Sequence, residues 1–415
     1  MQRGIIIAVS ICSLAICLVL IFSYGISNLG GTPEWKTYRI VPEYERFMGQ
    51  VVISFAIRDK TLGLHLELLK RLPDYTEIVL LLPKSGLQAI AAELKNQPFS
   101  KRTRLVTFDT ERKNNAHFYF VFPEREKLMD SGPVEDKAIP QGTLWVQDLF
   151  KVATKPNGQT VLLVSDIYKW FISYDADPSL KIVSDISYLG SLSSIGVEIK
   201  KLPLAFNGGN ILVDEFGGRR IVICGGDLFR RTQTVWKSTR DSTPTDAQIT
   251  DMLKEFLNAD EVVVVSRAKV QPSLMFHLDQ AIIFLPNGVA GITHVVGKRP
   301  DAMPDAEELK KVDYFLSELR SVLLRLGYRL VNIDTSVDNV LNYQYYVNAV
   351  PYVDAGTGQT TLLMPVFPSA QTQFEKELVE KNTAAFESLG YKVVHVPSNA
   401  DKFNGGIHCL VNVLR

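Results

Sequence analysis

The stretch RIVIC (220–224), with TDAQITDMLKEFLN (245–258) and EVVVVS (261–266) downstream of it, decides the class of fold. The first and third pieces are short β-branched runs, which are typical of buried strands. The middle piece carries its apolar residues at helical spacing. A strand, a helix and a second strand in this order predict an α/β unit.

The same alternation of strands and helices recurs along the chain. Units this small cannot each bury both faces of a helix–strand layer, so we expect them to form one ring-like α/β domain. An open, doubly wound sheet is the alternative that the alternation also allows. Roughly five units of about 65 residues account for nearly all of the chain after residue 40, at 50–109, 160–206, 220–266, 281–334 and 361–397.

The bulk composition excludes several classes of protein. Lysine plus arginine number 45, as do aspartate plus glutamate, so the net charge gives no indication of a nucleic-acid partner. Apolar residues make up 46% and aromatic residues 10% of the 415 residues, which excludes a disordered or fibrous chain. A chain of this length can bury a large core.

The N-terminal segment is different in character. Arg3 precedes an uncharged stretch, 4–22, and no charge follows until Glu34. Such a stretch is long enough to cross a bilayer as a helix, and the basic residue before it favours placing the rest of the chain outside the cytoplasm. An uncleaved signal-anchor, a signal peptide cut near Gly25 and a lipoprotein signal are the three interpretations.

The chain is therefore predicted to have three parts. They are a signal-anchor or signal peptide over 1–25, a linker over 26–40 and an α/β domain over 41–415. We expect the domain on the extracytoplasmic side, either anchored to the membrane by residues 4–25 or exported. The sequence gives no indication of the oligomeric state.

Two of the four cysteines fall in the predicted domain, too few for a disulfide framework. Cys224 lies in a β-branched run and is expected to be a small core residue. Cys409 lies six positions before the last residue in FNGGIHCLV (403–411), and FNGGNILV (206–213) shares its Phe-Asn-Gly-Gly lead-in. If the second run forms a strand, His408 points away from Cys409 and has a structural role.

Another stretch, FHLDQAIIFL (276–285), places a histidine and an aspartate inside an apolar run. His277 and Asp279 are two positions apart and would lie on one face of a strand. A buried carboxylate is costly unless it is paired or used, so Asp279 requires a partner.

Two more apolar runs carry isolated polar residues. TLWVQDLF (143–150) places Asp148 close to Trp145, and NYQYYVNAVPYVD places Asn348 among aromatic residues. Each of these residues, taken singly, is more typical of a structural role. A thiol, a His-x-Asp and a second aspartate together favour a catalytic set, because a thiolate attacks, a histidine transfers protons and two carboxylates can hold a planar cation.

The order Trp-x-x-Asp, Gly-Gly-Asn, His-x-Asp, Tyr-x-Asn and a terminal Gly-Gly-Ile-His-Cys resembles the agmatine deiminase and bacterial-type peptidyl-arginine deiminase family of guanidino-modifying enzymes. The resemblance covers residues 40–415 and implies a five-bladed, pseudo-symmetric α/β propeller of the pentein type. It implies that Cys409 is the nucleophile and His277 the general acid/base. The substrate-binding residues that it implies are Asp148, Asp279, Trp145, Asn210 and Asn348.

This chemistry requires no metal and no other cofactor. The expected partner is a guanidinium-bearing small molecule or an arginine-containing peptide, which is hydrolysed through a thiouronium intermediate on Cys409 with release of ammonia. An amidinotransferase, in which an amine intercepts the same intermediate, is the alternative enzyme. The alternative that is not an enzyme is a catalytically silent domain that binds arginine side chains.

Two positions depart from the pattern of the family. Gln147 replaces the arginine that usually precedes the aspartate, and Asn207 stands where agmatine-specific members usually have a glutamate. The second change removes one candidate carboxylate partner of His277 and favours a peptidyl-arginine substrate. Neither change affects the expected nucleophile, the histidine or the two aspartates.

Overall fold

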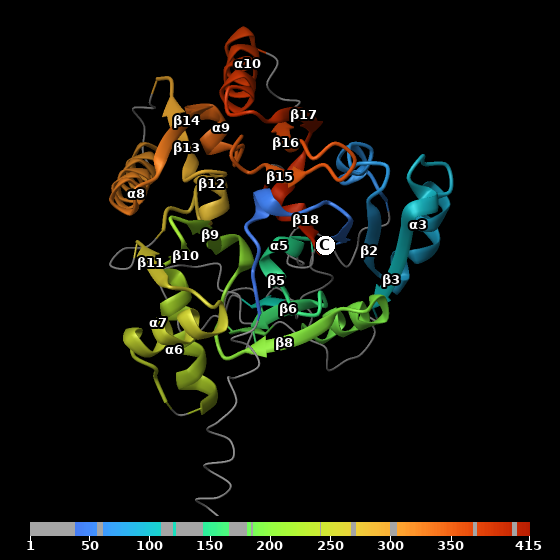
Figure 1. The fold of residues 1–415 in the computed structure, drawn as a ribbon, viewed down its shortest axis with the longest axis horizontal. Coiled ribbons are helices and arrows are strands. Elements are labelled where there is room, and N and C mark those ends of the chain that lie inside the picture. Colours follow the sequence, from blue (N-terminus) through green and yellow to red (C-terminus); the bar gives the residue numbers. More distant parts are fainter. Residues whose placement is uncertain are drawn as a thin grey trace, which may run out of the picture.

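Five small mixed β-sheets form a ring around the centre of the molecule (Figure 1). Two short strands, β4 (Tyr119–Val121) and β7 (Lys181–Val183), pair separately as an antiparallel ribbon. The structure is a computed structural model. It describes residues 38–55, 61–108, 119–121, 144–165, 181–183, 186–240, 242–266, 271–298, 305–367, 372–400 and 405–415.

The five sheets share one plan. In each of them a central strand has an antiparallel partner on one side and a parallel partner on the other. In the order antiparallel partner, central strand and parallel partner, the first sheet contains β18 (Val411–Val413), β1 (Gln50–Ser54) and β2 (Glu77–Pro83), and β3 (Thr103–Phe108) extends it. In the same order, the second sheet contains β5 (Phe150–Thr154), β6 (Thr160–Ser165) and β8 (Glu198–Leu202), and the third contains β9 (Ile211–Phe216), β10 (Arg219–Gly225) and β11 (Glu261–Val265). The fourth contains β12 (Ile282–Leu285), β13 (Val289–Val296) and β14 (Arg329–Ser336), and the fifth contains β15 (Val350–Val353), β16 (Thr360–Val366) and β17 (Lys392–Pro397).

Helices connect the parallel strands, because two parallel neighbours require a crossover while an antiparallel pair needs only a hairpin. The helices lie on the outside of the ring (Figure 1). The crossover elements of the first sheet are α2 (Leu66–Leu69), η3 (Lys84–Gly86), α3 (Leu87–Leu94) and η4 (Ser100–Arg102). Those of the other four sheets are the 3₁₀ helix η7 (Ile186–Ile195), the pair α6 (Asp227–Arg240) and α7 (Asp246–Phe256), α8 (Asp305–Leu326) and α10 (Gln373–Glu387). A short helix, α9 (Val337–Leu341), connects the fourth sheet to the fifth.

Local sequence explains these elements. Every residue of β1 and β6 is buried, as expected for short apolar strands that are covered on both faces. Helix α8 buries residues three or four positions apart, from Leu309 to Leu326, and leaves a charged face outside. Helix α7 begins with a capping box in which Thr245 and Gln248 satisfy each other's backbone amides.

The C-terminal strand completes the first sheet. Strand β18 pairs antiparallel with β1, with Val413 opposite Val51 and Val411 opposite Ile53. The two ends of the ring are thereby joined. This pairing places residues just before β18 at the centre of the molecule, where Figure 1 marks the C-terminus.

Residues 38–48, which we call the N-terminal strap, cross the ring (Figure 1). Arg39 forms a bridge with Thr154 of the second sheet, and Phe47 forms one with Val353 of the fifth. Between them, Tyr44 donates a hydrogen bond of 2.6 Å to the buried carboxylate of Asp214 in β9. The strap contains one turn of 3₁₀ helix, η2 (Glu43–Glu45), and so brings charged residues to the centre.

Several sequence predictions can now be compared with the structure. Five strand–helix–strand units are confirmed, and the open, doubly wound sheet is wrong, because the strands divide into separate small sheets. Cys224 is buried in β10, as predicted. For the unit at 160–206, the spacing of apolar residues also predicts a helix over 177–192. This prediction is wrong: β7 occupies 181–183 and a 3₁₀ helix follows, since the glycine and serines of this stretch favour the α-helix weakly.

The predicted signal-anchor or signal peptide at 1–25 lies outside the described residues. None of the helices in the described part of the chain combines the length and apolar composition that crossing a bilayer requires. The membrane segment therefore stays a prediction from sequence.

Candidate active site

A short turn precedes the antiparallel strand in each of the five sheets, and each turn carries one residue predicted for the site. The turns are α5 (Val146–Leu149), η8 (Gly208–Asn210), η9 (Leu278–Gln280), a tight turn over 345–348 and α11 (Ile407–Leu410). Several of them pack against one another. Because the sheets surround the centre, residues 61 to 69 positions apart converge there; they are Asp148, Asn210, Asp279, Asn348 and Cys409.

The turns correct one part of the sequence analysis. His277 and Asp279 are not on one face of a strand: His277 caps η9, Asp279 lies within it, and β12 begins only at Ile282. The runs around Asp148 and Cys409 also form helical turns. Their composition is that of buried strands, but side-chain hydrogen bonds to the backbone stabilise the turns instead; for example, the His277 amide donates to Gln280 Oε1 at 3.1 Å.

The thiol of Cys409 is buried, with 4% of the residue exposed. It lies 3.4 Å from Asp279 Oδ2 and 3.4 Å from the Nδ2 of Asn348. Burial raises the pKa of the Cys409 thiol well above its ordinary value, and the charges of Asp279 and Asp148 raise it further. Without a cation beside it, Cys409 is therefore held as the neutral thiol.

Two buried carboxylates flank the backbone of Gly209. A Cβ atom at this position would lie 2.8 Å from Asp148 Oδ1 and 2.9 Å from Asp279 Oδ2, which explains why a glycine stands there. Asp148 Oδ1 accepts a hydrogen bond from the Gly209 amide at 3.1 Å. Asp279 Oδ1 is buried without a hydrogen-bond partner among the described residues, and a free acceptor of this kind fits an N–H donor of a ligand.

The carboxylate of Asp148 has an unusual ionisation. Burial raises its pKa, the nearby His277 acts in the opposite direction, and the charge of Asp279 raises it again. The net result is a pKa above the ordinary value. A cationic ligand between the two carboxylates would reverse this effect, because it favours the charged form.

His277 is buried and lies between an amide and a carboxylate. Its Nδ1 is 3.4 Å from Asp148 Oδ1, and its Nε2 is 2.9 Å from the Nδ2 of Asn207. The ring also meets Phe276 edge-on, with the centroids 4.6 Å apart. Asn207, where a glutamate is usual in agmatine-specific members, thus contacts the histidine as an amide.

The two predicted asparagines connect neighbouring turns. Asn348 Oδ1 accepts from the His408 amide at 3.0 Å, and its Nδ2 donates to the Asp279 carbonyl at 3.2 Å. The turn that carries Cys409 is thereby attached to the turn that carries Asp279. A Cβ atom on Gly406 would come within 2.3 Å of Asn348 Oδ1, so this contact also requires a glycine.

Asn210 and Trp145 support the site without contacting the thiol in any recorded hydrogen bond. Asn210 Oδ1 accepts from the Leu278 amide at 3.2 Å, which holds the turn of Asp279, and its Nδ2 donates to Asp227 and Gln271. The ring of Trp145 packs against Gly405, where a Cβ would come within 2.4 Å of it. Both residues lie next to the turns of the site, neither supplies a reactive group, and their role in substrate binding stays a prediction.

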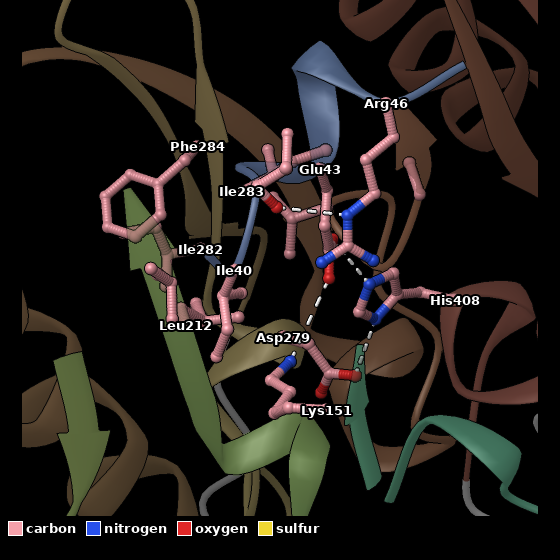
Figure 2. A pocket seen from close by; sticks show the side chains of 14 residues that line it. Ile40, Glu43, Arg46, Lys151, Leu212, Asp279, Ile282, Ile283, Phe284 and His408 are labelled. Atoms are coloured by element: carbon pink, nitrogen blue, oxygen red, sulfur yellow. Dashed lines mark hydrogen bonds and ion pairs between the residues drawn. The ribbon is translucent and has the colours of Figure 1, made fainter. Parts of the chain in front are cut away.

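The structure also brings His408 into the site, which the sequence analysis did not expect. His408 lies in a helical turn and therefore does not point away from Cys409 as it would in a strand. Its Nδ1 is 2.9 Å from Asp279 Oδ2, and its Nε2 is 2.8 Å from Glu43 Oε2 of the strap (Figure 2). No sequence pattern around Glu43 indicates this contact, because the two residues are 365 positions apart.

Further charged residues surround Glu43. Gln147 donates to Glu43 Oε1 at 3.0 Å, and Lys151 Nζ lies 3.9 Å from the same oxygen. Arg46 of the strap donates to the carbonyls of Val41 and Val413. Glu43, Arg46 and Lys151 line a cavity of about 30 Å³, which has room for one or two water molecules (Figure 2).

The arrangement defines the chemistry that the site can perform. A thiol and an imidazole are present together with two carboxylates, one of which has a free oxygen. Among the described residues there is no group of three or more His, Cys, Asp or Glu side chains that could hold a metal ion. The site is therefore suited to nucleophilic attack on a cationic group that both carboxylates can hold.

The fold matches solved structures of agmatine deiminases. The agmatine deiminase of C. jejuni has a TM-score of 0.55 and 14% identity, over 90% of this chain and 95% of that chain. The agmatine deiminase of Enterococcus faecalis has a TM-score of 0.56 and 12% identity, over 92% and 97%. At these identities the likeness concerns the fold alone.

A sequence model of the Porphyromonas-type peptidyl-arginine deiminase family matches residues 85–413. The chain belongs to this family of hydrolases, which act on the C–N bonds of amidines. No protein of curated function matches the sequence significantly.

Proposed function

We propose that this protein hydrolyses the guanidinium group of a peptidyl-arginine or agmatine-like substrate through a covalent intermediate on Cys409. One observation carries the proposal. Asp279 uses one carboxylate oxygen within 3.4 Å of the thiol and leaves the other buried and unpaired. A guanidinium bound by the free oxygen would place its central carbon next to Cys409.

In the first step the thiol proton of Cys409 passes to His277, and the sulfur adds as the thiolate to the central carbon of the guanidinium. Asp148 and Asp279 accept hydrogen bonds from its nitrogens and keep it planar and oriented until the attack. His277 then donates a proton to the departing nitrogen, the C–N bond breaks, and ammonia leaves. The product of this step is a thiouronium on Cys409.

In the second step a water molecule attacks the same carbon. His277 accepts one proton from the water, the C–S bond breaks, the hydroxyl proton passes to the sulfur, and the ureido product leaves with the Cys409 thiol restored; the proton on His277 then leaves with the released ammonia as ammonium. The amide of Asn207 at 2.9 Å from Nε2 and Asp148 at 3.4 Å from Nδ1 hold the imidazole for both transfers. No residue other than Cys409 becomes covalently modified.

The substrate assists in forming the nucleophile. The pKa of Cys409 is raised in the free protein by burial and by the two carboxylates. A bound guanidinium offsets both negative charges, so the thiolate becomes accessible only when the substrate is present. This order protects the thiol until it is needed.

Product analysis tests the proposal directly. Purified protein is incubated with agmatine, free arginine and an arginine-containing peptide, and ammonia and the ureido product are measured. We expect both products in equal amounts from at least one substrate, with the peptide favoured because Asn207 replaces a carboxylate. An amidino product formed only when an amine is added would indicate an amidinotransferase, and binding without any product would indicate an arginine-binding domain.

The finer features of fold and location are part of the same proposal. The five sheets are taken as the blades of a pseudo-symmetric propeller, with the five turns around its axis.

Residues 4–25 are proposed to attach the domain to the membrane, or to export it after cleavage near Gly25. Protease protection in spheroplasts tests the location, and a full-length chain found entirely in the cytosol would contradict it.

A further inference from the structure

Glu43 and His408 connect the N-terminal strap to the carboxylate next to Cys409. The His408 ring has one nitrogen 2.9 Å from Asp279 Oδ2 and the other 2.8 Å from Glu43 Oε2 (Figure 2). Glu43 precedes the residues 85–413 that the family's sequence model matches. The strap thus adds a charged side chain to the site from outside the matched part of the chain.

The geometry specifies the protonation of the histidine. An ionised carboxylate only accepts hydrogen bonds, so both ring nitrogens of His408 can pair with Asp279 and Glu43 only when both carry a proton. Burial opposes this charge, but the charge of Glu43 and the hydrogen bonds to both carboxylates outweigh burial and raise the pKa of His408 to about 10. His408 is therefore an imidazolium at neutral pH.

The surroundings keep Glu43 negative. Burial alone would raise its pKa, but the charge of His408, with Lys151 and Arg46, holds the pKa below its usual range. The groups that face the His408 ring are Glu43 from η2, Asp279 from η9 and the amide of Gln147 from α5, 3.3 Å from Nε2. Two negatively charged carboxylates and one neutral amide thus surround the ring.

This contact determines how Asp279 is oriented. The imidazolium holds Oδ2, which also lies 3.4 Å from the thiol, and rotation of the carboxylate would break that charge-assisted hydrogen bond. Oδ1 therefore remains the unpaired oxygen. A neutral His408 would hold Asp279 less firmly and leave more negative charge beside Cys409.

We propose that Glu43 and His408 are positioning residues, which hold Asp279 in the orientation that binds the guanidinium next to Cys409. The inference rests on the proposed deiminase activity. Neither residue contacts the substrate in this mechanism. The experiment must distinguish this positioning role from a purely structural one, in which the pair only attaches the strap to the ring.

Kinetics of Glu43→Gln in the full chain test the proposal, with Glu45→Gln as the matched control. Glu45 lies in the same turn, but its contact is with the exposed Arg39. We expect Glu43→Gln to lower kcat/KM about tenfold to a hundredfold and to shift the alkaline loss of activity to lower pH, because His408 loses one anionic partner. Loss of the pair with His408 should also lower the thermal stability of Glu43→Gln, so the kinetics are compared at temperatures where both variants are folded; equal kinetics and equal pH profiles in the two variants would overturn the proposal.

Two measurements without turnover separate this inference from the proposed function. Nitrogen NMR of His408 should show both ring nitrogens protonated at pH 8 in the wild type, and a titration at lower pH in Glu43→Gln. Calorimetry with agmatine and the Cys409→Ser protein should show binding about tenfold weaker when Glu43→Gln is added.

If the wild type gives no ureido product but both measurements come out as expected, deimination is wrong and the positioning of Asp279 stands. If His408 is neutral at pH 7 in the wild type, or agmatine binding is unchanged by Glu43→Gln, the positioning inference is wrong, whatever the activity.

Discussion

The turns before β9 and β18 follow the same sequence, Phe-Asn-Gly-Gly, but present different chemistry. In the first, Asn210 is buried with both polar atoms paired, to the Leu278 amide, Asp227 and Gln271. In the second, Cys409 faces Asp279, whose other oxygen has no partner.

The difference shows how equivalent positions in one fold divide their roles. A buried polar group whose hydrogen bonds are all made stabilises a structure, and its removal leaves its partners unpaired. A buried thiol that faces a carboxylate with an unpaired oxygen is disfavoured as the thiolate until a cationic ligand arrives, which is a condition suited to catalysis. The Asn210 turn supports the site, and the Cys409 turn is proposed to react.

Removal of the nucleophile should have the largest effect. We expect Cys409→Ser to lower turnover on the order of 10⁴-fold or more, because a serine hydroxyl is a far weaker nucleophile than a thiolate. Binding of arginine-like ligands should survive. The matched control is Cys224→Ala, in the core of β10, which should keep its turnover; full turnover in Cys409→Ser would refute the deiminase proposal.

Removal of one carboxylate should weaken binding and turnover together. Asp148→Asn deletes a charge-assisted hydrogen bond to the bound cation, a loss of about 1.5–3 kcal/mol, or roughly 10- to 150-fold in kcat/KM. Asp334→Asn is the control, since Asp334 is equally buried but is paired with His294 and Lys381. An unchanged KM and kcat in Asp148→Asn would remove Asp148 from the site.

The reactivity of the thiol against pH tests how the two carboxylates act on Cys409 at the second turn. Since the pKa of Cys409 is raised, its alkylation should be slow at neutral pH and accelerate only as the pH rises toward that raised value. A small, non-reactive guanidinium should increase the neutral rate by about tenfold, which corresponds to one pKa unit. Mass spectrometry of the alkylated peptides separates Cys409 from the other three cysteines of the chain; a rate that does not respond to the ligand would contradict substrate-assisted ionisation.

The first turn should show the smallest effect on activity and a clear effect on stability. Asn210→Ala leaves the Leu278 amide and the Asp227 and Gln271 side chains with fewer partners, at a cost of about 1–3 kcal/mol in the free energy of unfolding. Activity of the folded fraction should fall only a few-fold. Denaturant unfolding and kcat on one preparation check both; a loss of activity as large as that of Cys409→Ser would make the two turns equivalent.

The pH dependence of stability extends the comparison to His408. Its folded pKa, about 10, is raised from the ordinary 6.5, so its contribution to stability is complete below pH 6.5 and is lost as the pH rises through 10. Between these two pH values, the free energy of unfolding of the wild type should fall with rising pH. The fall should be steeper than in His408→Gln by up to about 1.4 kcal/mol per pH unit. Unfolding of both proteins at pH 7 and pH 9 measures this difference.

The sequence by itself determined the α/β units, because the periods of strands and helices depend on residues close together in the chain. It also determined the residue types of the site, which are a thiol near the C-terminus, His277, two aspartates and two asparagines. Each lies inside an apolar run, where burial of a polar side chain is costly unless that side chain is hydrogen-bonded or has a function. The near-regular spacing of five of them reflects the repeated plan of the sheets.

Tertiary structure decided the conformation of those runs and the partners of their side chains. The runs around Asp148, Asp279 and Cys409 have the composition of strands but fold as turns, because buried polar contacts between neighbouring turns outweigh local propensity. The pairing of β18 with β1 and the contact of Glu43 with His408 join residues from opposite ends of the chain. Local sequence patterns carry no information on such contacts, since packing around the centre of the ring alone brings these residues together.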